Sequence, residues 1–212
     1  MGVLGLLVAC NKPTLMQAAQ QGDIVAVKKL LAAGVDVNST DSLGETALVG
    51  SLLNDHPELV KLLLEAGAGP NVRAEDGEPA LILAAMNGNK EAVETLLDYG
   101  VDINTQITHN SPNIDAIHDQ TTALIVAAEG GFLDVVELLL KRGADVNVQG
   151  RTGLSALMGA AIFGHYDVVK LLLEYGADIN ATDEEGETAL SWSQQEGHTE
   201  IVELLKAAGA KE

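Results

Sequence analysis

The sequence predicts an all-α solenoid, a stack of helix-turn-helix units joined by β-turn-like loops. Three observations predict it: a period of 33 residues, glycines at fixed places within each period, and a core that must be aliphatic. Of the 212 residues, 47% are apolar but only 3% are aromatic. Because Leu, Val and Ala can fill the thin space between stacked helices, this composition suits a repeat array better than a large globule.

The period is visible in six leucines that head similar segments. The intervals between them are 33, 33, 43, 33 and 33 residues, so one ten-residue insertion interrupts a constant period. These residues are Leu15, Leu48, Leu81, Leu124, Leu157 and Leu190. A glycine follows 19 residues after each leucine, and a second glycine follows seven residues after each, except where Asp55 stands. Such self-similarity is the signature of a repeat architecture.

We therefore divide the chain into three parts. An apolar segment covers residues 1–12, six repeats cover 13–210, and a short tail covers 211–212. The repeats are expected at 13–44, 45–77, 78–120 with the insertion, 121–153, 154–186 and 187–210.

Each repeat is expected to hold two helices, as the fifth shows. Ser155 can cap a first helix over residues 156–163, and Gly164 can end it in the left-handed conformation. A second helix follows over 167–174. Asp55 fits the place of a glycine because Asp tolerates that conformation better than most residues.

A polar turn of the form Asp-x-Asn, such as Asp178-Ile179-Asn180, follows the second helix. We expect its Asn to bond its own backbone. A calcium loop is excluded, because Asp183 stands where such a loop needs glycine.

Several motifs resemble the ankyrin repeat family. The family's T-P-L-H-x-A signature survives in part as Thr-Ala-Leu at 46–48, 122–124 and 188–190, although its His is absent. Gly-Ala-Asp-x-Asn is intact at 143–147 and 176–180, and Gly-His occurs at 164–165 and 197–198. The resemblance covers nearly the whole chain and implies a non-catalytic protein-protein interaction module, an adaptor or a scaffold.

The resemblance also implies that a partner lies along the concave side, against loop tips and exposed faces of the first helices. Carried over position by position, the expected partner-binding residues are Leu43, Glu45, Leu53, Glu75, Asp76, Glu78, Met86, Asn87, Glu129, Arg151, Leu154, Ile162, Phe163, Glu184, Glu185 and Glu187. The set combines acids with a few apolar anchors. An alternative that stays open is that the acids form only a solvated face.

Charge narrows the class of partner. Twelve Lys and Arg against 31 Asp and Glu give a net charge of −19, which repels the phosphate backbone of nucleic acids. This excess of negative charge favours a protein that stays monomeric. It also favours a protein partner with a basic or polar surface.

Little in the sequence points to catalysis. It holds no H-E-x-x-H, no phosphate-binding glycine loop and no G-x-S-x-G turn, so we expect neither an enzyme nor a cofactor. The insertion, residues 106–120, carries His109, Asp115, His118 and Asp119. A metal-binding loop is a weaker alternative there, since their spacing fits no established zinc pattern. A long loop that contacts a partner is the favoured interpretation. An inhibitory or regulatory subunit of an enzyme complex is the other alternative.

Cys10 is the residue that bears on where in the cell the protein resides. Leu7-Val8-Ala9-Cys10 resembles the lipobox of bacterial lipoproteins, in which the cysteine is lipidated. No Lys or Arg precedes Cys10, so either translation starts upstream of Met1 or the resemblance is accidental. Both a cytoplasmic location and membrane anchoring at the cell envelope through Cys10 remain open.

Overall fold

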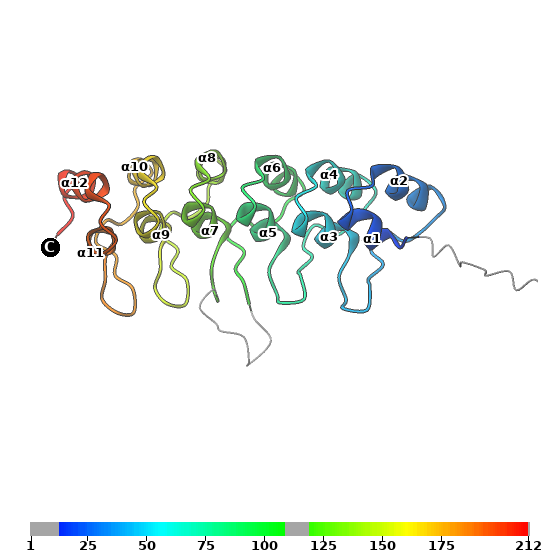
Figure 1. Cartoon of the computed structure of the whole chain (residues 1–212), viewed down its shortest axis with the longest axis horizontal. Helices are drawn as coiled ribbons and strands as arrows, with labels where there is room; N and C mark the ends of the chain where they lie inside the picture. The colour runs from blue at the N-terminus through cyan, green and yellow to red at the C-terminus, as the bar shows by residue number, and fades with distance from the viewer. Residues whose placement is uncertain (1–12, 109–118, 212) are drawn as a thin grey trace, which may run out of the picture.

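The computed structural model of the protein describes residues 13–108 and 119–211, which form twelve α-helices in two layers (Figure 1). The inner layer holds α1 (Leu15–Gln20), α3 (Ala47–Leu53), α5 (Ala80–Met86), α7 (Ala123–Glu129), α9 (Ala156–Ile162) and α11 (Ala189–Gln195). The outer layer holds α2 (Ile24–Ala32), α4 (Pro57–Glu65), α6 (Lys90–Asp98), α8 (Leu133–Lys141), α10 (Tyr166–Glu174) and α12 (Thr199–Ala207). The predicted all-α solenoid is confirmed. Among the described residues, no helix combines the length and the apolar character needed to cross a bilayer.

Local chemistry fixes the ends of the helices. The Ser155 hydroxyl accepts a hydrogen bond from the Met158 N–H at 3.3 Å, which satisfies a free amide at the start of α9. Gly164 adopts a φ of 76° after α9, and Asp55 adopts 55° at the equivalent place after α3. The capping role of Ser155 and the left-handed conformation of Asp55 are both confirmed.

The core is a row of aliphatic side chains between the layers. The six leucines that define the period are all buried, and Leu48 and Leu81 are fully so. Each outer helix adds one stripe, such as Val168, Val169 and Leu172 in α10. Because neighbouring repeats cover these side chains, each repeat depends on the next for its stability.

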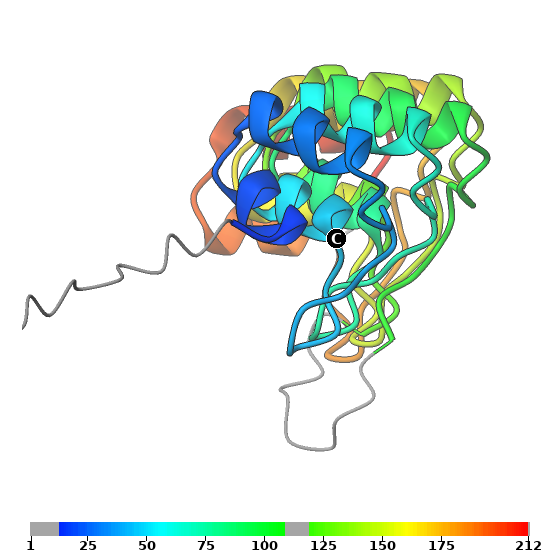
Figure 2. The same ribbon diagram turned by 90° about the vertical axis from the view of Figure 1, so that its right-hand side faces the viewer.

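Hairpin loops join the repeats and extend from the helix layers in one direction (Figure 2). Isolated β-bridges close their bases, for example between Arg73 and Pro79. The inserted loop is also closed at its base, where the Ile107 N–H donates to the Thr121 carbonyl at 3.1 Å. His109, Asp115 and His118 of this loop lie outside the described residues, as does Cys10.

The asparagines of the polar turns do not bond their own backbone, which corrects our expectation. In the fourth repeat the Asp145 carboxylate accepts the hydrogen bond within the turn, from the Asn147 N–H at 3.0 Å. The Asn147 carboxamide reaches the next repeat instead, where it accepts from the Asp178 N–H at 2.8 Å. Equivalent bonds join Asn38 to Gly69, Asn104 to Asp145, and Asn180 to Lys211. These asparagines therefore couple successive repeats.

Aromatic rings form a second coupling between repeats. The Nε2 atom of His165 lies 2.8 Å from the Glu129 carbonyl oxygen, so this nitrogen carries the proton. The ring lies so close to Gly131 that a β-carbon there would come within 2.5 Å of it. His56 and His198 each make the same contacts with the repeat that precedes their own. In the fourth repeat Phe132 takes the place of the histidine. These three histidines therefore have a structural role.

Candidate partner-binding surface

One surface of the solenoid carries most of the expected binding residues. We call it the concave surface; it is formed by the hairpin loops and by the adjoining sides of the inner helices (Figure 2). Large apolar side chains are exposed on it: Leu43 in a loop, Leu53 and Met86 at the ends of α3 and α5, and Phe163 after α9. Met86 is 50% exposed and Phe163 58%. Such side chains offer a partner apolar area that water covers in the free protein.

A groove of about 310 Å³ lies at the middle of the concave surface, and we call it the central groove. It spans three repeats. Met86 belongs to α5, Val126 and Glu129 belong to α7, and Phe163 directly follows α9. Its remaining lining comes from Glu78, Ile107 and Gly130.

A missing side chain explains why the surface is hollow there. Gly130 occupies the position that holds Asn87 in the third repeat and Phe163 in the fifth. The glycine has its own structural reason, since a β-carbon would come within 2.3 Å of the Phe132 ring. With the Phe132 ring in this position a side chain at residue 130 would collide with it, and the glycine leaves room between Met86 and Phe163.

A stacked histidine ring holds the side chain of Phe163 in place. Its ring stacks on His165, with 6.4 Å between the ring centroids and 28° between the planes. His165 is itself held by the Glu129 carbonyl. Glu129 in turn lies over Gly159, where a β-carbon would come within 2.7 Å of its Cγ atom.

Charges are distributed unequally between the two layers. No inner helix of the described chain contains Lys or Arg. The lysines that the structure describes up to residue 206 all lie on outer helices, at positions 28, 29, 61, 90, 141, 170 and 206. The loops hold Arg73, which donates to the Gly77 and Gln106 carbonyls, and Arg151, which pairs with Asp119 at 3.3 Å. The concave surface is therefore predominantly acidic.

Many of the expected residues lie at four places along this surface. Leu43 and Leu53 lie toward the N-terminal end, and Glu78, Met86, Glu129 and Phe163 meet in the central groove. Near the C-terminal end, Glu184 and Glu185 are exposed at a loop tip and Glu187 is half-buried. The loop before the central groove exposes Glu75 and Asp76.

Some expected residues are less accessible than the sequence indicated. Glu45 is only 8% exposed, and its carboxylate accepts from the Glu75 N–H at 3.3 Å, so it holds two loops together. Asn87 is exposed, but its carboxamide donates to the Leu52 carbonyl at 2.7 Å. Leu154 and Ile162 are half-buried.

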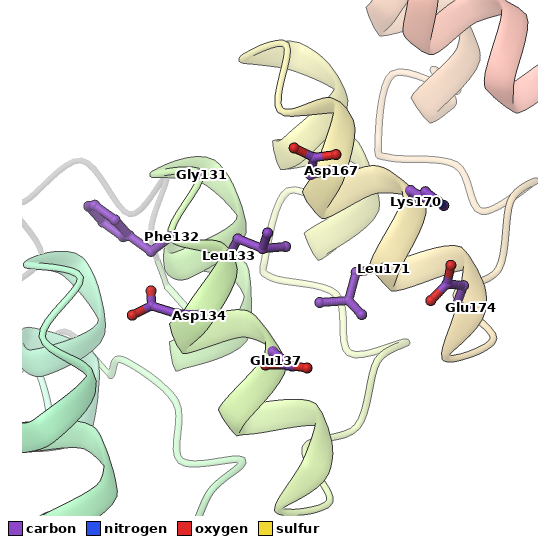
Figure 3. A pocket seen from close by; sticks show the side chains of 9 residues that line it. All are labelled: Gly131, Phe132, Leu133, Asp134, Glu137, Asp167, Lys170, Leu171 and Glu174. Carbon is purple, nitrogen blue, oxygen red and sulfur yellow. The ribbon is translucent and has the colours of Figure 1, made fainter.

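A second depression, which the sequence did not predict, lies on the outer layer between α8 and α10. Its volume is about 620 Å³, and Figure 3 shows Leu133 and Leu171 facing the space between the two helices. Charged residues surround them: Asp134, Glu137, Asp167, Lys170 and Glu174. Phe132 also lines it and stands where the next repeat has His165.

Ion pairs on the outer helices explain the resolved pKa shifts. The Lys141 ammonium donates to the Glu137 carboxylate at 2.7 Å and lowers the pKa of Glu137, while the same bond raises the pKa of Lys141. Arg142 pairs with Asp98 at 2.8 Å and with Glu94 at 3.3 Å, which joins α8 to α6 and raises the pKa of Arg142. These pairs are exposed, and none lines the central groove.

Metal coordination finds no support in the part of the chain that the structure describes. No three His, Cys, Asp or Glu side chains within residues 13–108 and 119–211 are grouped so as to hold a metal ion. Of the four residues considered for a metal loop, the structure describes Asp119, which pairs with Arg151.

Comparison with known proteins agrees with this architecture. The family model for ankyrin repeats in sets of three matches residues 15–107, 105–183 and 124–212. The crystal structure of an ankyrin repeat domain from Acinetobacter baumannii AYE superposes with a TM-score of 0.79 and 31% sequence identity, over 93% of this chain and 98% of that one. No curated protein matches the sequence. Ankyrin repeats generally serve as protein-protein interaction modules, and by its matched repeats and its architecture this chain belongs to the ankyrin repeat family.

Proposed function

We propose that the protein is a non-catalytic adaptor or scaffold, a monomer whose concave surface binds a partner protein with a basic or polar surface. The observation that carries the proposal is the exposure of Met86 and Phe163 on either side of the central groove, within a surface that is otherwise acidic. Exposed apolar anchors surrounded by charge are typical of binding surfaces, where the anchor supplies affinity and the charge speeds the encounter.

The packing of the solenoid does not require these two side chains. Met86 and Phe163 are among the most exposed large apolar residues of the described chain, whereas Leu81 and Leu157 of the same inner helices are fully buried. A partner would cover them and gain the free energy of removing apolar surface from water.

The experiment is partner capture from a lysate of the source organism with three purified proteins. The first is the unaltered chain, the second carries Met86→Ala and Phe163→Ala, and the third carries Leu133→Ala and Tyr175→Ala. The control pair matches in kind, because Leu133 and Tyr175 are each 41% exposed but belong to the outer layer. Thermal melting checks that all three proteins are folded.

We expect a partner that the unaltered chain and the control retain and that the Met86 and Phe163 variant loses. Loss of the partner from the control alone would move the binding surface to the outer helices. Equal capture by all three proteins, or capture by none, would refute a binding role for the concave surface.

A further inference from the structure

We infer that the central groove receives one large apolar side chain from an extended, basic segment of the partner. This inference rests on the proposed function and makes its partner more specific. The recognised element would be a short stretch of chain with Leu, Met or Phe as its anchor and with Lys or Arg close by on both sides.

The shape of the groove favours a single anchor. Val126 and Ile107, both nearly buried, form an apolar floor, and Met86 and Phe163 stand exposed beside it. The volume of about 310 Å³ lies at the small end of the range for ligand pockets, which is about 300–1,000 Å³. Such a space suits one large side chain better than a folded surface. Met86 adds adaptability, since its unbranched thioether side chain can adjust to different anchors.

Charge complementarity indicates a basic segment. Glu78 and Glu129 line the groove itself, so acids lie beside the apolar floor. Glu75 and Asp76 extend the negative charge along the loop before the groove. The described lysines up to residue 206 lie on the outer helices, and the guanidinium of Arg73 donates to two carbonyl oxygens. A positively charged segment would meet little repulsion on this surface.

An extended conformation would bring the apolar anchor and the basic residues to the same face of the segment. In an extended chain, successive side chains point to opposite sides, so residues two positions from the anchor face the same way as the anchor. The long stems of Lys or Arg at these positions can bring their charges to the acids around the groove while lying along apolar surface. The expected motif is therefore a basic residue, any residue, the anchor, any residue, and a basic residue.

The test uses synthetic peptides of nine residues and the full-length protein. One peptide has Phe flanked by Lys two positions away on each side, a second has Ser in place of Phe, and a third has Glu in place of Lys. Binding is measured by fluorescence polarisation of labelled peptides. In parallel, methyl NMR follows the methionines, where buried Met16 and Met158 serve as internal references for exposed Met86. Met86→Leu assigns the Met86 signal.

We expect the Phe and Lys peptide to bind at least tenfold more tightly than either other peptide. It should shift the Met86 methyl signal and leave those of Met16 and Met158 in place. Phe163→Ala and Glu78→Lys should each weaken binding at least tenfold. Glu203→Lys, which makes the same charge change on an exposed position of outer helix α12, should change it less than threefold.

Two results would overturn the inference. Equal binding of the Phe and Ser peptides would show that charge alone attracts the segment, and a Met86 signal that none of the peptides shifts would show that the groove takes no anchor. Either result would leave the proposed function standing if the capture experiment still gives a partner that depends on Met86 and Phe163. Such a partner would then bind through a folded surface.

Discussion

Replacing Asn147 by Ala tests the coupling between repeats most directly. The substitution removes two hydrogen bonds to the fifth repeat: from the Asp178 N–H to the Asn147 carboxamide oxygen at 2.8 Å, and from the Asn147 amide to the Gly176 carbonyl at 3.4 Å. A typical hydrogen bond contributes about 0.5–1.5 kcal/mol net. The second bond is long and both are exposed, so water replaces part of the loss. We expect Asn147→Ala to lower the free energy of unfolding by about 1–2 kcal/mol.

Asn71 supplies the matched control. It occupies the same place in the second repeat and is exposed, but among the described residues its side chain makes no equivalent bond to the next turn. Urea unfolding followed by circular dichroism gives the free energies of both variants. Asn71→Ala should change stability by less than about 0.5 kcal/mol, as surface substitutions usually do. Equal losses in the two variants would refute the assignment of coupling to the inter-repeat bonds.

Three further predictions concern packing, backbone conformation and charge. Leu139→Ala should lower the free energy of unfolding by about 2–5 kcal/mol, measured by urea unfolding, because Leu139 is fully buried in α8. Gly153→Ala should destabilise more than Gly186→Ala in the same measurement. The φ angles are similar, 80° and 83°, but only at Gly153 would a β-carbon come within 2.7 Å of the next loop's backbone. In carboxyl NMR titrations Glu137 should titrate below the usual range for Glu, and Lys141→Ala should raise its pKa, since the Lys141 hydrogen bond lowers it. Because this pKa is lowered on folding, its contribution to stability is complete above the pKa of the unfolded chain. It is lost as the pH falls through the folded value.

Much of the scaffold could be predicted because it depends on local chemistry. A hydroxyl at the start of a helix and a left-handed residue at its end act within a few residues, so Ser155 and Asp55 could be interpreted without knowledge of the fold. The buried leucines followed from their period alone.

Contacts between repeats could not be predicted in the same way. An asparagine in a turn can bond its own backbone or a neighbour's, and only the distance between successive turns decides; for Asn147 the neighbour is favoured. Glu45 was expected at the surface because the family resemblance placed it among the partner-binding residues. Its burial depends on the Glu75 N–H, which lies one repeat further along.

The central groove shows why partner specificity is harder to predict than the fold. One position of the repeat holds Asn54, Asn87, Gly130 and Phe163 in successive repeats. Asn54 and Asn87 donate to carbonyls of α3 at 2.9 and 2.7 Å, so at this position they support the scaffold. Phe163 makes no such bond among the described residues, since it has no polar group, and it remains exposed. The groove arises where two consecutive repeats lack the supporting asparagine. The fourth repeat has Gly130 in its place and the fifth has Phe163. Because each change looks minor in a single repeat, the binding feature becomes visible only when neighbouring repeats are placed side by side.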